Sequence, residues 1–550
     1  MKRRLAAIAL VTAAAVHASS NPLAAQPAGS PALRYYAPLP PAAQPKVVET
    51  DLCVYGGTPG GLGAAIQMRR MGKRAALMEF GRHLGGMTAS GLGRTDFGNK
   101  AAIGGIAREF YRRLGRHYGE EESFYFEPKV AERTLQEMVR EAGVEVYLEE
   151  RLRSVRKDGN RIVEMVMESG NSCRAPMFVD ASYEGDLMAM AGVSYRVGRE
   201  SNATYDETLN GVHFGHPNHN FNVFVDPYVG EGDPSSGLLP GISADPPGEQ
   251  GDGDHRVQAY NFRLLLTNVP ENRRPFPKPA GYDPARYTLL ARYIEAGVWD
   301  AMNLNWPLKN GKTDLNNYGG FSTDNIGRNY EWPEGDYATR ERIFQDHVTY
   351  QQGLLWFLAN DERVPERIRR EVRTWGLPRD EFPETGGWPH QLYIREARRM
   401  IGALVMTEHH CVRRRAEPDV VGLAAYTMDS HNCQRVVRAG RVMNEGNVEV
   451  GGFPPYPISY RAIVPREAEC ANLLVPVGLS SSHIAYGSIR MEPVFMVLGQ
   501  SAATAAALAI EGGLPVQRVE YARLRARLLA DGQALEWSGV TRREDLEPPR

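Results

Sequence analysis

Near its beginning the chain places a short apolar segment, a glycine-rich turn and a segment of small residues in direct succession. Residues 47–55 have the apolar character of a buried strand, and residues 62–71 are typical of a helix. Between them stands the turn Gly56-Gly57-Thr58-Pro59-Gly60-Gly61. Gly56 permits a tight turn, and Gly61 lets the helix pack closely against the sheet. This order predicts an α/β fold with a phosphate-binding site at the N-terminus of the helix.

A carboxylate ends the next predicted strand. Residues 74–79 form a second apolar segment that closes with Glu79, 23 positions after Gly56. An acid at this place accepts hydrogen bonds from the ribose 2′-hydroxyl of a dinucleotide and repels a 2′-phosphate. Thr58 departs from the usual pattern, because a second glycine normally stands there to let the backbone approach the phosphate. Residues 81–93 are so rich in glycine that we expect an ordered loop lying along the bound molecule.

Six blocks of the sequence together resemble the FAD-dependent oxidoreductase family, a bacterial branch of the glutathione-reductase-like flavoproteins with many exported members. The blocks are the glycine turn with Glu79, the run Arg82-His83-Leu84-Gly85-Gly86-Met87, and residues 178–186, 388–400, 428–432 and 476–500. The resemblance implies a Rossmann-like, glutathione-reductase-like FAD-binding domain of the α/β class with an inserted α+β substrate or cap domain. We expect FAD to be held noncovalently, because the rest of a covalent attachment motif is absent around His83.

The same resemblance implies which residues contact FAD. The strand that contains Val146 would line the adenine side, and a helix that begins near Pro493 would point its N-terminus at the N1/O2 edge of the flavin. Such a helix end stabilises the negative charge of reduced flavin by about 0.3–2 kcal/mol. The predicted contact residues are Gly56, Gly57, Thr58, Pro59, Gly60, Gly61, Glu79, Arg82, Gly85, Gly86, Met87, Val146, Asp180, Gly185, Asp186, Gly487 and Met491.

Changes in composition divide the chain into parts. Residues 46–200 and 410–515 form the two parts of the FAD-binding domain, because the motifs for one FAD site are split between them. Residues 201–409, rich in Pro, Gly, Asn and aromatic residues, form the inserted domain, framed by predicted helices near 338–358 and 391–405. Residues 26–45 contain six prolines and form an extended linker. Residues 516–550 form a C-terminal helical extension.

The first 25 residues have the layout of a signal peptide. Lys2, Arg3 and Arg4 precede an apolar run from Leu5 to Val16. That run is shorter than the roughly 20 apolar residues needed to span a bilayer. We therefore expect an exported protein, periplasmic or secreted, with no stable membrane anchor. The formal net charge of −2 gives no attraction to nucleic acid, so the expected partners are a small-molecule substrate and an electron acceptor of unknown identity.

Neither a disulfide framework nor a metal site is predicted. The five cysteines show no CxxC spacing, and the pairing of Cys411 with Cys433 stays open. His409, His410 and Cys411 are adjacent, so their side chains diverge on a helix or a strand instead of converging on a metal.

Flavin accepts a hydride at N5, so the protein must orient the substrate and remove a proton. His431 and His483 are the candidate bases, since each lies in a family-like block and imidazole titrates near neutral pH; each also fits a hydrogen-bonded structural histidine. Arg395 and Arg490 are candidates for holding an anionic or polyhydroxyl substrate. Arg395 and Arg398 are expected on one face of a helix, and a salt bridge is favoured for Arg398.

The leading hypothesis is an FAD-dependent dehydrogenase or oxidase that transfers a hydride between a small polar, carbohydrate-like substrate and flavin N5. The carbohydrate part rests on export, on the habits of the family and on six tryptophans in the inserted domain, which fit a protein core equally well. The alternative hypothesis is a noncatalytic flavin- or carbohydrate-binding protein on the same scaffold.

Overall fold

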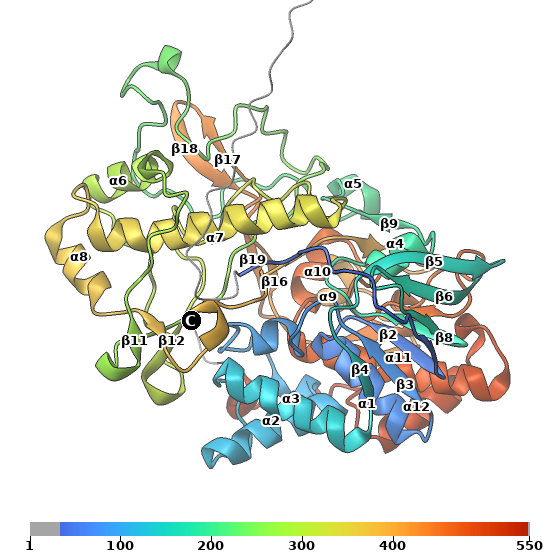
Figure 1. The fold of residues 1–550 in the computed structure, drawn as a ribbon. Helices are drawn as coiled ribbons and strands as arrows, with labels where there is room; N and C mark the ends of the chain where they lie inside the picture. Colours follow the sequence, from blue (N-terminus) through green and yellow to red (C-terminus); the bar gives the residue numbers. More distant parts are fainter. Residues whose placement is uncertain (1–32, 548–550) are drawn as a thin grey trace, which may run out of the picture.

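The computed structural model describes residues 33–547, so the predicted signal peptide lies outside the described residues. A parallel sheet of five strands, ordered β21-β8-β2-β3-β4, forms its centre (Figure 1). The strands are Leu473–Leu474 (β21), Met177–Asp180 (β8), Leu52–Tyr55 (β2), Ala75–Met78 (β3) and Glu145–Tyr147 (β4). The helix α1, Pro59–Arg70, connects β2 to the parallel strand β3. The predicted α/β, Rossmann-like fold is confirmed.

The segment predicted as one strand, residues 47–55, divides between two sheets, and in this respect the prediction is wrong. β1, Val47–Glu49, pairs with β7, Ser172–Arg174, whereas β2 lies in the central sheet. The backbone turns from one sheet to the other at Thr50, whose N–H donates to the carbonyl of Arg174, and at Asp51, whose carboxylate accepts from the N–H of Arg74. The segment therefore divides between two sheets because it bonds to two different neighbouring segments, although its apolar pattern is uniform.

A smaller sheet with the order β1-β7-β6-β5 lies beside the central one. β6, Arg161–Met167, runs antiparallel to β5, Leu152–Asp158, and to β7. β5, β6 and β7 therefore form an antiparallel ribbon.

The central sheet is buried on both faces. Along β2, Leu52 and Val54 belong to one apolar core, while Cys53 and Tyr55 belong to another. Alternate residues of a strand point to opposite faces, so the four side chains of β2 pack into two different cores. The first core contains α1, α2 (Gly105–Tyr118), α3 (Pro128–Ala142) and α11 (Glu492–Gly512), and the second contains residues of β5, β6 and β7. A strand that is covered on both faces has a sequence that is an unbroken apolar run.

Two helices from opposite ends of the chain touch through their backbones. α1, blue in Figure 1, packs against α11, red in the same view. A Cβ atom on Gly499 would lie 1.9 Å from the carbonyl oxygen of Gly60, and one on Gly63 would lie 2.6 Å from that of Met496. Within residues 33–547, α11 is the one helix long and apolar enough to cross a membrane, and 94% of its most apolar stretch is buried inside the protein.

The inserted part contains four complete α-helices, of which α5 (Asn202–Tyr205) is the first, and short antiparallel strand pairs. Its elements include β10 (Leu264–Thr267) with β12 (Lys312–Leu315), β11 (Arg273–Arg274) with β13 (Leu377–Pro378), α6 (Thr288–Glu295), α7 (Tyr337–Asn360) and α8 (Glu366–Arg373). α7 confirms the helix predicted near residues 338–358, and it runs across the upper part of the molecule in Figure 1.

The helix predicted near residues 391–405 does not form. This segment is irregular except for β14, Arg399–Met400, which pairs with β9, Tyr195–Arg196. Arg395, Arg398 and Arg399 therefore do not share a helical face. They form ion pairs in three directions, with Asp324, Asp186 and Glu200 respectively. These buried ion pairs outweigh the local helix propensity of the sequence.

The last part of the chain returns to the central sheet through short elements. They are α9 (Glu408–Cys411), β15 (Val420–Ala424) with β20 (Tyr456–Ser459), β16 (Met428–Ser430) with β19 (Val448–Val450), β17 (Gln434–Arg438) with β18 (Arg441–Glu445), α10 (His483–Ile489) and α12 (Tyr521–Ala530). α4 (Asp186–Met190) stands earlier, between β8 and the insertion. All five cysteines lie within the described residues and are free and buried. Residues 531–542 are not helical, so the C-terminal extension is helical only in part.

We expect Gly499→Ala to destabilise the protein by about 3 kcal/mol, at the upper end of the cost of overpacking, because the added methyl meets a backbone oxygen that cannot move away. Chemical denaturation of the two proteins measures the difference. Gly281→Ala is the matched control, since its Cβ would lie no closer than 3.4 Å to Thr349. Equal losses of stability in the two variants would contradict the proposed backbone contact.

Candidate active site

A cavity of about 410 Å³ opens where the turn between β2 and α1 meets the end of β3. Seven of the residues predicted to contact FAD line it, namely Gly56, Gly57, Thr58, Glu79, Arg82, Gly86 and Asp186. The end of β4, the loop after β8 and the segment around His390 supply other parts of its wall. The cavity thus lies at the carboxyl ends of the parallel strands, where α/β sheets bind their ligands.

Thr58 explains the departure from the glycine pattern. Its hydroxyl donates to the carbonyl of Ala181 at 2.7 Å and accepts from the N–H of Gly61 at 3.4 Å, so it caps α1 and ties the turn to β8. A Cβ atom on Gly61 would lie only 1.9 Å from the carbonyl oxygen of Gly56. Pro59 occupies the first turn of α1, where its missing N–H costs nothing. The remaining first-turn N–H groups can face a phosphate.

Glu79 is held in place by the backbone. Its two carboxylate oxygens accept hydrogen bonds from the N–H groups of Gly57 at 2.5 Å and Gly81 at 2.6 Å. Burial raises its pKa above the usual range, although these two hydrogen bonds favour the charged form. The carboxylate is therefore held at the cavity wall by the backbone, and its predicted role toward the ribose stays a prediction.

The cavity wall also carries a polar atom that lacks a partner. The Nδ1 atom of His390 is buried and accepts or donates no hydrogen bond within the described residues. The ring of His390 stacks on that of His83 at 3.8 Å, and His83 in turn pairs with Glu132. A buried polar atom without a partner costs free energy unless a ligand or water satisfies it. With the glycine turn, Glu79 and this imidazole, the residues present fit FAD.

The other predicted contact residues lie behind the cavity wall. Asp180 accepts hydrogen bonds from Ser182 and from the N–H of Met188, and burial raises its pKa to about 6. It braces the loop after β8 instead of facing the cavity. The remaining positions outside the lining are Pro59, Gly60, Gly61, Gly85, Met87, Val146, Gly185, Gly487 and Met491. Their predicted roles toward FAD stay predictions.

A buried carboxyl stands at the N-terminus of α11. Glu492 accepts hydrogen bonds from the hydroxyl of Tyr183 at 2.9 and 3.0 Å, and that hydroxyl accepts from the N–H of Met87. Burial raises the pKa of Glu492 to about 8. The group is therefore protonated at neutral pH and adds no negative charge at a helix end that would face reduced flavin. The sequence analysis missed this residue.

His431 forms a dyad with a carboxylate from the inserted part. Its Nδ1 atom lies 2.9 Å from Oδ2 of Asp324, while its Nε2 atom lies 3.9 Å from Oδ2 of Asp429, beyond hydrogen-bonding distance. Burial and the nearby Arg395 guanidinium lower the pKa of His431. A carboxylate that accepts the Nδ1 proton leaves the lone pair on Nε2. His431 is therefore neutral with its basic nitrogen free of a direct partner.

His483 has a different environment. Its Nδ1 atom pairs with Glu396 at 2.7 Å, and its Nε2 atom with the hydroxyl of Ser430 at 3.0 Å. Burial, together with the charge of Arg399, lowers its pKa to about 3. Both ring nitrogens are used inside the protein, so the geometry favours His431 over His483 as a base.

The two predicted substrate arginines flank one tyrosine. Tyr393 lies 4.6 Å from the guanidinium of Arg395 and 5.8 Å from that of Arg490, and its hydroxyl accepts from Arg490 at 3.0 Å. Arg395 also pairs with Asp324 at 2.9 Å. Arg395, Arg490 and His431 are thus brought together. Arg398 instead pairs with Asp186 and Glu334, the salt-bridge role favoured by the sequence.

This cluster is not part of the cavity lining, but it is joined to the cavity wall by a short chain segment. Gln391 lines the cavity and donates its N–H to the hydroxyl of Ser90, and Tyr393 follows two residues later. On the other side Gly487 lets α10 approach β16, because a Cβ atom there would lie 2.5 Å from the carbonyl oxygen of Asp429. Asp324 was missed by the sequence analysis, since no motif surrounds it and only the fold carries it to His431.

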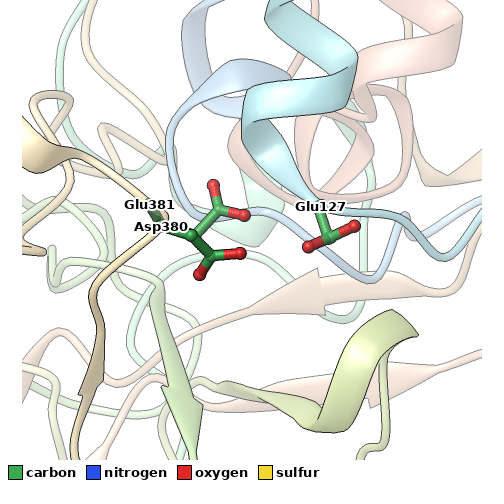
Figure 2. A group of neighbouring side chains, drawn as sticks. All are labelled: Glu127, Asp380 and Glu381. Atoms are coloured by element: carbon green, nitrogen blue, oxygen red, sulfur yellow. The ribbon is translucent and has the colours of Figure 1, made fainter. Parts of the chain in front are cut away.

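Three carboxylates elsewhere lie close enough together to bind a cation. Glu127 faces Asp380 and Glu381 across the start of α3 (Figure 2). The ammonium of Lys312 already contacts all three, at 2.8 Å from Asp380 and 3.1 Å from Glu381, and its side chain is fully buried. This group is an ion-paired joint between the first FAD-binding part and the inserted part.

Comparisons with known proteins gave one family match over most of the chain and partial matches to solved structures. A family model described as FAD dependent oxidoreductase matches residues 51–528. No curated protein matches the chain. Three solved structures match in part: the flavin-dependent brominase Bmp2 (18% identity, 28% of this chain, 42% of that chain, TM-score 0.21), p-nitrophenol 4-monooxygenase PnpA from Pseudomonas putida DLL-E4 (15%, 28%, 46%, 0.22) and L-proline dehydrogenase from P. horikoshii (13%, 29%, 59%, 0.23). Each match covers less than two thirds of the other protein.

The raised pKa of Glu492 makes stability depend on pH. An unfolded glutamate, with the usual pKa of 4.5, loses its proton before the folded one, whose pKa is about 8. The stability that Glu492 contributes is therefore complete below pH 4.5 and is lost as the pH rises to about 8, by up to about 1.4 kcal/mol per pH unit. Relative to wild type, Glu492→Gln should gain stability between pH 5 and 8.

Chemical denaturation of the FAD-free proteins at several pH values tests this expectation. Glu511→Gln on the same helix is the control, because Glu511 is exposed and pairs only with surface cations. Curves for Glu492→Gln and wild type that stay parallel from pH 5 to 8 would show that Glu492 does not hold its proton.

Proposed function

The chain belongs to the FAD-dependent oxidoreductase family, and from this premise we propose that it transfers a hydride between a small polar, carbohydrate-like substrate and flavin N5, with His431 as the base. It is an FAD-dependent enzyme, so the noncatalytic alternative falls away. The observation that carries the proposal is the His431–Asp324 dyad, whose basic Nε2 atom faces away from its carboxylate partner.

The dyad prepares His431 to take a proton from a substrate hydroxyl. Asp324 accepts the Nδ1 proton and so fixes the tautomer, and the lowered pKa keeps the imidazole neutral at pH 7. In alcohol oxidation the hydroxyl proton passes to Nε2, the hydrogen on the adjacent carbon leaves with its electron pair, and a carbonyl forms. Bound FAD supplies the acceptor for that electron pair.

A polar wall around the dyad supports a polyhydroxyl substrate. Arg395 and Arg490 flank Tyr393, and their terminal N–H groups bond within the protein. Among the described residues, the Nε–H of each is buried without a hydrogen-bond partner and could donate to a substrate hydroxyl. Alternating donors and acceptors suit several hydroxyl groups better than an apolar molecule. The tryptophans give less support than expected, because Trp332 and Trp388 are fully buried in the core.

We also propose that the enzyme works outside the cytoplasm. The support is the cationic start at Lys2–Arg4 and the apolar run that follows it. Within residues 33–547 the apolar helix α11 is buried, which agrees with a protein released from the membrane after export.

Anaerobic mixing with a panel of sugars, amines and hydroxy acids identifies the substrate by loss of the flavin absorbance. With that substrate, we expect His431→Gln to retain FAD but to reduce it about 100-fold more slowly, the usual loss for a missing base. His117→Gln, at an exposed position, is the control and should react normally. A wild-type rate of flavin reduction in His431→Gln would show that His431 is not the base.

The pH profile separates a base from a merely structural histidine. The rate should fall at pH values below 6.5, because the pKa of His431 is lowered. Asp324 raises that pKa by its charge, so Asp324→Asn should move the acid limb to still lower pH while also slowing the reaction. An acid limb that does not move in Asp324→Asn would argue against the dyad.

For export, expression of the full chain in a Gram-negative bacterium should yield a periplasmic protein that begins close to residue 26. N-terminal sequencing of the purified protein measures this start. Replacing Ile8 with Arg interrupts the apolar run and should leave the uncleaved chain in the cytoplasm. Wild-type protein that keeps Met1 and stays in the cytoplasm would contradict the proposal.

A further inference from the structure

The segment Leu33–Leu39, which we name the N-terminal strap, forms part of the wall of the FAD cavity. In Figure 1 this dark-blue stretch runs below α7 toward the central sheet. Five of its residues line the cavity, namely Leu33, Arg34, Tyr35, Ala37 and Leu39. The cavity lining also includes Phe80, Gly81 and Arg82, which follow Glu79, and Glu149 and Arg151, which follow β4. The strap therefore borders the end of the cavity where the ribose and adenine are expected.

Both parts of the protein hold the strap in place. The N–H groups of Tyr35 and Tyr36 both donate to Oε2 of Glu341 on α7, each at 2.8 Å. The side chain of Gln345, one turn later on α7, donates to the carbonyl of Leu33 at 2.7 Å. From the FAD-binding part, Arg151 donates to the carbonyl of Ala37 at 2.7 Å. The linker predicted for residues 26–45 is thus anchored from Leu33 onward.

The strap also closes an aromatic cluster at the cavity. The ring of Tyr35 stacks on Phe80 with 4.6 Å between centroids and meets the edge of Trp332 at 4.8 Å. Its hydroxyl donates to Glu184, which lines the cavity as well. Because Phe80 directly follows Glu79, this stack stands next to the carboxylate predicted to bind the ribose.

We propose that the N-terminal strap is part of the FAD-binding site, where it covers the adenosine half of the cofactor and retains it. The inference rests on the placement of FAD in this cavity. It requires that FAD enter before the strap docks and that FAD leave only after Tyr35 and Glu341 separate. A signal peptide removed after residue 25 leaves the whole strap on the mature chain.

Release of FAD from the purified holoenzyme tests the strap, followed as the rise in flavin fluorescence after dilution. Glu341→Ala removes both backbone anchors from outside the cavity, and Tyr35→Ala removes the stack on Phe80. We expect both variants to release FAD about tenfold faster, which corresponds to about 1.4 kcal/mol of lost retention. Tyr35→Phe keeps the stack and should release FAD nearly as slowly as wild type.

Glu331→Ala is the matched control, because Glu331 is an exposed carboxylate that pairs with Arg342 of α7 and does not contact the strap. Thermal unfolding of each variant shows whether it is folded. Hydrogen exchange gives a readout independent of release, since the amides of Tyr35 and Tyr36 should exchange more slowly in the holoenzyme than in the FAD-free protein.

Glu79→Ala separates failure of the strap from failure of the FAD placement. If Glu79→Ala weakens FAD binding while Glu341→Ala and Tyr35→Ala release FAD at the wild-type rate, the strap proposal is overturned and the placement stands. If Glu79→Ala binds FAD as tightly as wild type, the placement fails, and the strap proposal fails with it.

Discussion

The backbone contact between α1 and α11 holds the two ends of the FAD-binding domain together. At Gly60 and Gly499 the helices approach so closely that a single methyl group would meet a carbonyl oxygen. α1 begins at the phosphate-binding turn, and α11 begins at Glu492, beside the loop that contains Met87. Because both helices belong to one packed pair, the glycine turn and the start of α11 have a fixed separation.

Burial decides the charge of the groups around that site. Glu492 is deprived of water and keeps its proton, while His431 and His483 lose theirs. Desolvation disfavours the charged form of every such group unless a partner compensates it. Asp186 is compensated, since the guanidinium groups of Arg340 and Arg398 both pair with it. The region thus combines neutral titratable groups, suited to proton transfer, with ion pairs that fix its shape.

The inserted part contributes side chains to the proposed reaction and also holds the N-terminal strap. Asp324 reaches His431 from the insertion, and Arg395 joins them from the segment that leads back to the sheet. α7 of the same insertion holds the N-terminal strap through Glu341. The dyad and the strap therefore both depend on how the insertion packs against the FAD-binding domain.

Local sequence determined the parts of this enzyme that local backbone geometry can encode. The glycine turn, Glu79 and the apolar strands predicted the parallel sheet and the ribose acid, because turn conformation and strand burial depend on neighbouring residues. The tertiary structure alone decided that residues 391–405 are irregular, that Asp324 meets His431 and that Tyr35 lines the cavity. These outcomes depend on ion pairs and stacks between residues far apart in the chain, which no local pattern records.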